Sequence, residues 1–294
     1  MMQSIFQKGF WLVLSVRKPY NTTRAPLFFR GEDKETMAMK LVILAGGQQS
    51  TISNEKEGVP KPMVDIGGKP VLWHIMKYFS THGVREFIIC GGYKVGMLKE
   101  YFMNYYIYQS DITVNLQENT IEIHKKRTED WQVTVVDTGI YASTAQRVSR
   151  VQEYIGKEDF LVTYGDCLED LDVKAFWQQH KNSGKICTLA VARPSGRNVI
   201  LPISEKGNLM KESAMHGTDA WTSAGIYAFS PRVFNYFQGS YELDYFVKGI
   251  LTDQKQVSIY KHPGFWQPVE TRRDLVMMEN MWNAEVAPWK KWQD

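Results

Sequence analysis

The segment Leu41-Val-Ile-Leu-Ala-Gly-Gly47 decides the fold class of this chain. Its four leading apolar residues predict a short strand that is buried on both faces, as in a parallel sheet. The strand ends in a small residue and two glycines, whose missing side chains let backbone N–H groups approach a base or a phosphate. In open α/β sheets ligands bind outside the carboxyl ends of the strands. We therefore expect a strand at 41–44 that leads into a ligand-binding turn.

Beyond this segment, short β-rich runs alternate with amphipathic helical stretches. This alternation predicts an α/β fold, with a Rossmann-like, mainly parallel sheet, helices on both faces and a small β/helical C-terminal addition. The predicted strands are 41–44, 86–90, 112–115, 121–124, 133–137, 160–164, 186–192, 199–204, 225–229 and 257–260. The predicted helices are 71–82, 95–105, 147–155, 172–182, 242–252 and 273–283.

The positive charge of the chain is concentrated at its front. The 294 residues carry a formal net charge of +3, of which residues 1–40 contribute +4 and the remainder −1. We expect residues 1–39 to be a poorly ordered N-terminal extension and residues 40–294 to form a single domain. The apolar run 10–16 is too short to span a bilayer. It leaves a targeting peptide open as an alternative, although Arg17 and Lys18 follow it where small residues are usual.

Composition excludes several classes of protein. A hydrophobic content of 44% with 23% charged residues is typical of a globular chain, and the folded part has no basic stripe for nucleic acid. The chain has three cysteines, Cys90, Cys167 and Cys187, which form no CxxC pair. An odd, dispersed set fits a reducing compartment better than a disulfide framework, and we expect a cytoplasmic protein without a membrane span.

Three residue patterns could carry chemistry. Gly46 and Gly47 suit a nucleotide, Asp166 at the end of an apolar run suits a hard cation, and Lys61 between two prolines suits a phosphate. Each has a plain structural alternative: a tight turn, a helix N-cap and a surface lysine. His74 lies on an apolar helical face and is expected to be a core residue.

Together these motifs resemble a known family. Residues 41–47, 60–94, 133–139 (VTVVDTG), 163–172 (TYGDCLEDLD) and 262–274 (HPGFWQPVETRRD) are similar to the glucose-1-phosphate cytidylyltransferases of bacterial surface-sugar biosynthesis, in the sugar-nucleotidyltransferase superfamily. The resemblance implies transfer of CMP from CTP to a small phosphorylated acceptor, with release of pyrophosphate and with Mg²⁺ as cofactor. It also implies self-association, to which the tryptophans near the C-terminus could contribute.

The resemblance assigns roles to individual residues. Lys61 and Arg147 would meet the phosphates as the catalytic pair, and Asp166 and Glu270 would hold the metal. Lys211 and Ser223 would bind the acceptor. The nucleotide would be held by Leu44, Ala45, Gly46, Gly47, Lys61, Thr138 and Gly139.

The chain departs from the family in two places. Thr51 stands where relatives have an arginine that meets the triphosphate, and the acceptor segment around Lys211 and Ser223 is altered. These departures leave three hypotheses open. The first is that the acceptor is glucose 1-phosphate or a related sugar phosphate, as in the family. A non-sugar phosphate such as L-glutamine phosphate, used in capsule modification, is the second. A non-catalytic nucleotide-binding paralogue is the third.

Overall fold

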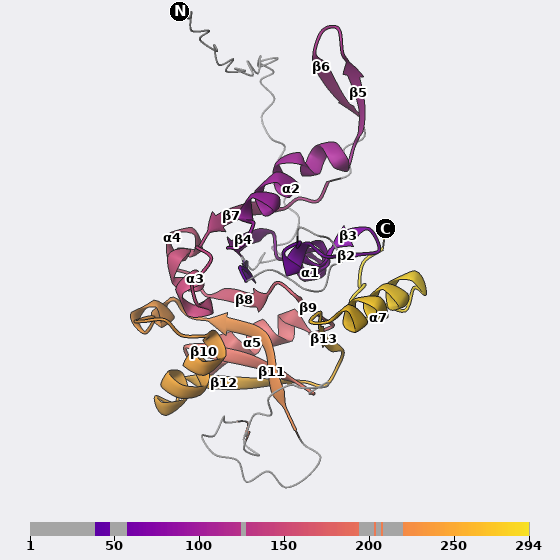
Figure 1. The fold of residues 1–294 in the computed structure, drawn as a ribbon. Coiled ribbons are helices and arrows are strands. Elements are labelled where there is room, and N and C mark those ends of the chain that lie inside the picture. Colours follow the sequence, from indigo (N-terminus) through magenta and orange to yellow (C-terminus); the bar gives the residue numbers. More distant parts are fainter. Residues whose placement is uncertain are drawn as a thin grey trace, which may run out of the picture. The chain divides into compact units, whose positions relative to one another are not determined.

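A seven-stranded sheet forms the centre of the protein (Figure 1). The structure, a computed structural model, describes residues 39–47, 58–124, 128–193, 203, 207 and 220–293. Only β11 runs antiparallel to its neighbours, so the sheet is mainly parallel, as predicted. In spatial order its strands are β12 (Val257–His262), β10 (Cys187–Ala192), β11 (Thr222–Phe229), β8 (Phe160–Tyr164), β1 (Lys40–Ala45), β4 (Glu86–Gly91) and β7 (Gln132–Asp137).

Alternate side chains of the central strands enter two separate apolar cores. Leu41 and Ile43 of β1 pack into one core, whereas Val42 and Leu44 pack into the other. Side chains of a strand point to opposite faces of the sheet, so a strand covered on both faces must be apolar throughout. This is why the uninterrupted apolar run at 41–44 predicted the strand correctly.

Helices cover both faces, as the predicted fold class requires. The face that takes Leu41 is covered by α1 (Val71–Thr81), α2 (Val95–Tyr108), α5 (Val173–Ser183) and α7 (Arg272–Asn283). The other face is covered by α3 (Thr144–Arg150), α4 (Gln152–Ile155), α6 (Leu243–Phe246) and the 3-10 and π turns η2 (Pro231–Asn235) and η3 (Val247–Leu251). None of the helices among the described residues is long and apolar enough to cross a membrane.

Most predicted elements are confirmed, but two helices differ. The helix predicted at 147–155 begins earlier, at Thr144, because Ser143 and Gln146 form a capping box, and it breaks at Val151. The helix predicted at 242–252 changes from α6 to a π turn at Val247. The strand predicted at 199–204 lies outside the described residues except for Ile203, as does the expected extension 1–39 except for Met39.

Several short elements were not predicted, and they shape the ends of the sheet. The 3-10 turn η1 (Lys61–Met63) and the β2 (Asp65–Ile66)–β3 (Lys69–Pro70) hairpin precede α1. The β9 (Cys167–Glu169) and β13 (Trp266–Pro268) strands pair with each other. By contrast, the strands predicted at 112–115 and 121–124 are confirmed as β5 (Asp111–Asn115) and β6 (Thr120–His124), and they form an exposed hairpin that projects beyond α2 (Figure 1).

The C-terminal addition packs back onto α1. Trp289 is fully buried and its indole N–H donates to His74 Nδ1 at 3.4 Å, so His74 Nε2 carries the proton that it donates to the Ile66 carbonyl at 2.8 Å. Burial lowers the pKa of His74 to about 4 and keeps it neutral. His74 is therefore a core histidine, as predicted, and Trp289 stabilises the chain's own fold.

Glu169 on β9 is a buried acid. Its side chain is 2% exposed, and neither carboxylate oxygen has a hydrogen-bond partner among the described residues. Burial raises the pKa of Glu169 to about 8, and the neighbouring Asp170 adds to the rise. Between about pH 4.5 and pH 8 the folded state holds a proton that the unfolded chain has lost, so stability falls as the pH rises through this window.

We expect Glu169→Gln to remove this loss, because glutamine does not ionise. Chemical unfolding at several pH values should show the variant gaining on the order of a few kcal/mol relative to the unsubstituted protein between pH 5 and pH 8. Glu153→Gln, at an exposed glutamate, is the matched control and should leave the pH profile unchanged. Parallel profiles for the unsubstituted protein and Glu169→Gln would contradict the assignment.

Candidate active site

The carboxyl ends of adjacent parallel strands bring the predicted loops together. β8, β1, β4 and β7 are consecutive neighbours, so the turn after β1 lies beside the turns after β8 and β4. The Gly165 N–H donates to the Leu44 carbonyl at 3.0 Å, and a side chain on Gly92 would approach the Cα of Gly46 to 3.2 Å. These contacts fix the two-glycine turn against both neighbouring strand ends.

A cavity of about 310 Å³, here called the glycine-loop cavity, opens above this turn. It brings together six of the predicted site residues, namely Leu44, Ala45, Gly46, Gly47, Lys61 and Asp166. The cavity is also lined by residues next to predicted site residues, namely Pro60, Pro62, Tyr164 and Gly165, and by Thr144, which sequence reasoning missed.

Lys61 is aimed across the glycine-loop cavity at Asp166. Pro60 precedes it and Pro62 follows it at the start of η1, and its Nζ donates to Asp166 Oδ2 at 3.3 Å. Both side chains are partly exposed, so the ion pair contributes little to stability. The ion pair matters instead for position. It places the Lys61 ammonium, which can bind a phosphate, beside the Asp166 carboxylate, which can bind a metal ion.

Arg147 lies behind the glycine turn, buried at 2% exposure. Its Nη1 donates to Thr138 Oγ1 and to the Gly139 carbonyl, both at 2.8 Å, and to the Gly91 carbonyl at 3.2 Å. Its Nη2 donates to the Ile140 carbonyl at 3.2 Å. The guanidinium thus joins the ends of β4 and β7 beneath the turn that follows β1. Its predicted contact with phosphates stays a prediction.

The Arg147 guanidinium keeps its positive charge although it is buried. Burial lowers the pKa of Arg147, but a guanidinium remains protonated at any physiological pH. Among the described residues no carboxylate forms an ion pair with it, and Glu242 and Asp137 act on it only at longer range. A positive charge therefore lies directly under the backbone of Gly46.

Thr138 and Gly139 accept hydrogen bonds from Arg147 and so help to hold its side chain. Thr138 is fully buried, and its hydroxyl donates to the Gly91 carbonyl at 2.6 Å while accepting from Arg147. Gly139 has a φ of +79°, and its N–H is bonded to Asp137 Oδ1. Neither residue lines the glycine-loop cavity, so direct contact of either with a nucleotide also stays a prediction.

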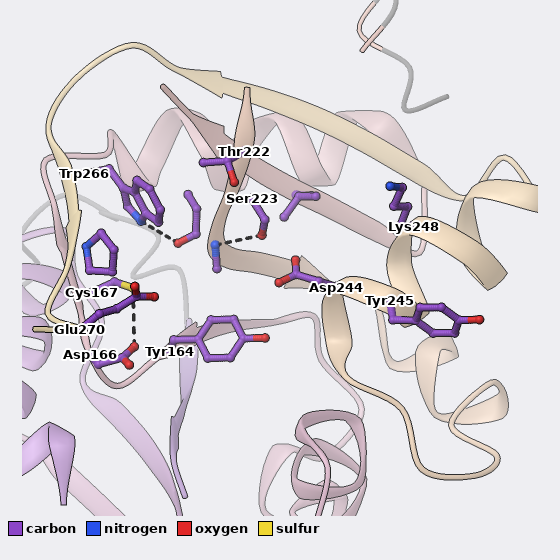
Figure 2. Close-up of a pocket in the computed structure, with 14 residues that line it drawn as sticks. Tyr164, Asp166, Cys167, Thr222, Ser223, Asp244, Tyr245, Lys248, Trp266 and Glu270 are labelled. Carbon is purple, nitrogen blue, oxygen red and sulfur yellow. Dashed lines mark hydrogen bonds between the residues drawn. The ribbon is translucent and has the colours of Figure 1, made fainter. Parts of the chain in front are cut away.

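Asp166 and Glu270, the predicted metal carboxylates, lie on the walls of a second cavity of about 510 Å³, here called the Trp266 cavity (Figure 2). They are 104 positions apart in the chain. The β9–β13 pairing joins their segments, and the Val269 N–H donates to the Asp166 carbonyl at 2.7 Å. Asp166 and Tyr164 also line the glycine-loop cavity, so the two cavities adjoin, and together they are called the crevice below.

The two carboxylates fit a hard, oxygen-ligated cation. Among the described residues no group of three or more histidine, cysteine, aspartate or glutamate side chains is arranged to hold a metal ion. Asp166 and Glu270 can therefore supply part of a coordination shell, with phosphate and water oxygens supplying the rest.

The structure describes one of the two predicted acceptor residues, Ser223. Ser223 lines the Trp266 cavity, and its Oγ accepts from the Gly225 N–H at 3.1 Å. Lys211 and Thr51 lie outside the described residues. Sequence reasoning missed Asp244 and Lys248 on this cavity's wall, because no motif marks them and only folding brings α6 and η3 to the site.

Comparisons with known proteins identify the family of the chain. Residues 40–280 match the family model described as "Nucleotidyl transferase". The chain is 44% identical to the glucose-1-phosphate cytidylyltransferase of Salmonella typhi over 259 residues, which cover 87% of this chain and all of the relative. It is 34% identical to the probable glucose-1-phosphate cytidylyltransferase of Bacillus subtilis over 263 residues, covering 86% of this chain and all of that relative.

Solved structures support the fold. HddC from Yersinia pseudotuberculosis superposes with a TM-score of 0.63 at 21% identity, covering 83% of this chain and 99% of that one. A putative glucose-1-phosphate thymidylyltransferase from Bacillus anthracis superposes with a TM-score of 0.61 at 16% identity, covering 83% and 95%. These identities are too low to carry a function, so they bear on the fold alone.

The two glycines of the turn should tolerate a methyl group very differently. A Cβ on Gly46 would lie 2.1 Å from Arg147 Nη1, whereas a Cβ on Gly47 would have nothing within 4 Å. We expect Gly46→Ala to lower the free energy of unfolding by roughly 1–3 kcal/mol through overpacking. Gly47→Ala is the matched control for stability. Equal melting temperatures for the two variants would contradict the packing described here.

Proposed function

The chain belongs to the glucose-1-phosphate cytidylyltransferase family of nucleotidyl transferases, and we propose that it transfers CMP from CTP to a sugar 1-phosphate, with glucose 1-phosphate as the first acceptor. The observation that carries the proposal is the convergence of Gly46, Gly47, Lys61, Asp166 and Glu270 on one crevice, where a family member is expected to bind its substrates.

The reaction needs positioning and charge neutralisation more than covalent chemistry. A phosphate oxygen of the acceptor attacks the α-phosphorus of CTP in line, a new P–O bond forms, and the bond from the α-phosphorus to the bridging oxygen breaks. Pyrophosphate leaves with the electron pair of that bond. The backbone of Gly46 and Gly47 would hold the triphosphate, and Lys61 would turn from Asp166 to meet it.

Arg147 would act on the triphosphate from beneath. Its positive charge lies behind Gly46, and it forms no ion pair with a carboxylate of the described residues, so the potential at the turn favours an anion. This contribution matters because Thr51 replaces the family arginine that would otherwise meet the triphosphate. We infer that this chain therefore depends more on Arg147 than a relative that has both arginines.

Asp166 and Glu270 would hold Mg²⁺, which when bound supplies charge neutralisation at the reacting phosphates. The support is the donor set, two carboxylates on the crevice walls whose segments are joined by β9 and β13. Lys61 balances Asp166 while the nucleotide is absent.

The wider role is proposed on the same basis. A CDP-sugar made in the cytoplasm would feed synthesis of a surface polysaccharide, and the enzyme would work as a homo-oligomer. The altered acceptor segment keeps L-glutamine phosphate as an alternative acceptor, and Thr51 keeps a non-catalytic nucleotide-binding role as a second alternative. The assay below separates these three functions.

We expect pyrophosphate release from CTP, Mg²⁺ and glucose 1-phosphate, measured by a coupled phosphate assay. Lys61→Met should lower kcat/KM by about 10²–10³-fold, because a cation is lost where charge develops, and Asp166→Asn should lower it at least as far. Glu153→Gln, remote from the crevice and exposed, is the control and should keep full activity.

The outcome with other substrates decides between the functions. Release with L-glutamine phosphate but not with sugar phosphates would replace the proposed acceptor. Metal-dependent CTP binding by calorimetry with no release from any ester would support the non-catalytic role. Full activity in Asp166→Asn would contradict the proposed metal site.

We also propose that residues 40–294 form the whole catalytic domain, since the family match begins at residue 40. Removing residues 1–38 should then leave the calorimetric dissociation constant for CTP unchanged within about twofold. A marked loss of affinity in the truncated protein would place part of the site in the removed segment.

A further inference from the structure

Asp244 places a third carboxylate on the wall of the Trp266 cavity. It lies in the first turn of α6, with Lys248 one helical turn further along in η3. Figure 2 shows Asp166 and Glu270 together at one end of this cavity and Asp244 and Lys248 toward the other. The cavity therefore has two chemically distinct ends.

The Asp244 carboxylate is held in one orientation by a buried tyrosine. The Tyr227 hydroxyl donates to Asp244 Oδ1 at 2.6 Å, and the Tyr227 side chain is fully buried in β11. The start of α6 is fixed as well, because the Leu243 N–H donates to Thr144 Oγ1 at 2.7 Å. In the described part of the chain, Asp244 Oδ2 receives no hydrogen bond.

A carboxylate so placed selects what can approach it. It repels a phosphate and accepts hydrogen bonds only, so it favours a hydroxyl or amino group. The phosphate of an acceptor would therefore lie toward Asp166 and Glu270, where a cation can neutralise it. The opposite end of the acceptor would then face Asp244, with Lys248 as a donor beside it.

From this geometry we propose that Asp244 is a specificity-determining residue that accepts a hydrogen bond from a sugar hydroxyl of the acceptor, and that Tyr227 positions it. The site thereby selects polyhydroxylated sugar phosphates over simple phosphate esters. This inference rests on the proposed function and deepens it, because it states that the protein recognises the acceptor by a sugar hydroxyl at the end opposite its phosphate.

Asp244→Asn tests the assignment with little disturbance of the fold. The asparagine carbonyl can still accept from Tyr227, while the amide nitrogen replaces the oxygen that accepts from substrate. We expect KM for glucose 1-phosphate to rise by about 10- to 100-fold, the range for a lost charge-assisted hydrogen bond, with KM for CTP unchanged. Asp111→Asn, on the exposed β5 strand, is the matched control and should leave both constants unchanged.

A set of monodeoxy glucose 1-phosphates locates the hydroxyl. The unsubstituted enzyme should discriminate against at least one of them, and Asp244→Asn should lose that discrimination. Tyr227→Phe should weaken it in the same direction, and Asp244→Glu should restore part of it. Thermal unfolding of each variant separates these effects from loss of the fold.

The outcomes against the inference are distinct. An active enzyme whose acceptor KM and deoxy-analogue preferences are unchanged in Asp244→Asn would overturn the role of Asp244 and leave the proposed function standing. A preference for a phosphorylated amino acid that Asp244→Asn abolishes would overturn the hydroxyl assignment. An unsubstituted protein that releases no pyrophosphate with any ester would overturn the proposed function, and this inference with it.

Discussion

The buried guanidinium of Arg147 is the constraint on which the rest of the site depends. It satisfies carbonyls at the ends of β4 and β7 and lies against Gly46, so three strand ends are held together by one side chain. Without it the Gly139 and Ile140 carbonyls would lose this donor, whereas the Gly91 carbonyl would still accept from the N–H and the hydroxyl of Thr138. Glycine is required at position 46 because the guanidinium fills the space that a side chain would need.

The other residues of the crevice are positioned by two short elements next to the glycine turn. The β9–β13 pairing carries Asp166 and Glu270 to the same cavity, and the proline-flanked turn η1 directs Lys61 at Asp166. Groups that must act on highly charged substrates are thus ordered before those substrates arrive. The rigidity comes from backbone hydrogen bonds and buried apolar strands, because the partly exposed Lys61–Asp166 pair adds little to stability.

The sequence predicted the central architecture well where the pattern was local. An unbroken apolar run marked β1, and the glycines after it marked the turn that lines the glycine-loop cavity. Contacts between distant segments were not predictable in this way: the pairing of β9 with β13, the approach of Asp244 through α6, and the burial of Arg147 under Gly46. Each depends on tertiary packing that leaves no periodic signal in the chain.

The account holds that this crevice binds CTP over the glycine turn, with Lys61 exchanging Asp166 for phosphate. The most direct measurement is a crystal structure of the protein with CTP and Mg²⁺. The account predicts the triphosphate against the backbone of Gly46 and Gly47, with Lys61 Nζ on a phosphate oxygen and a metal on Asp166. Nucleotide bound elsewhere, or Lys61 still paired with Asp166 beside a bound triphosphate, would contradict it.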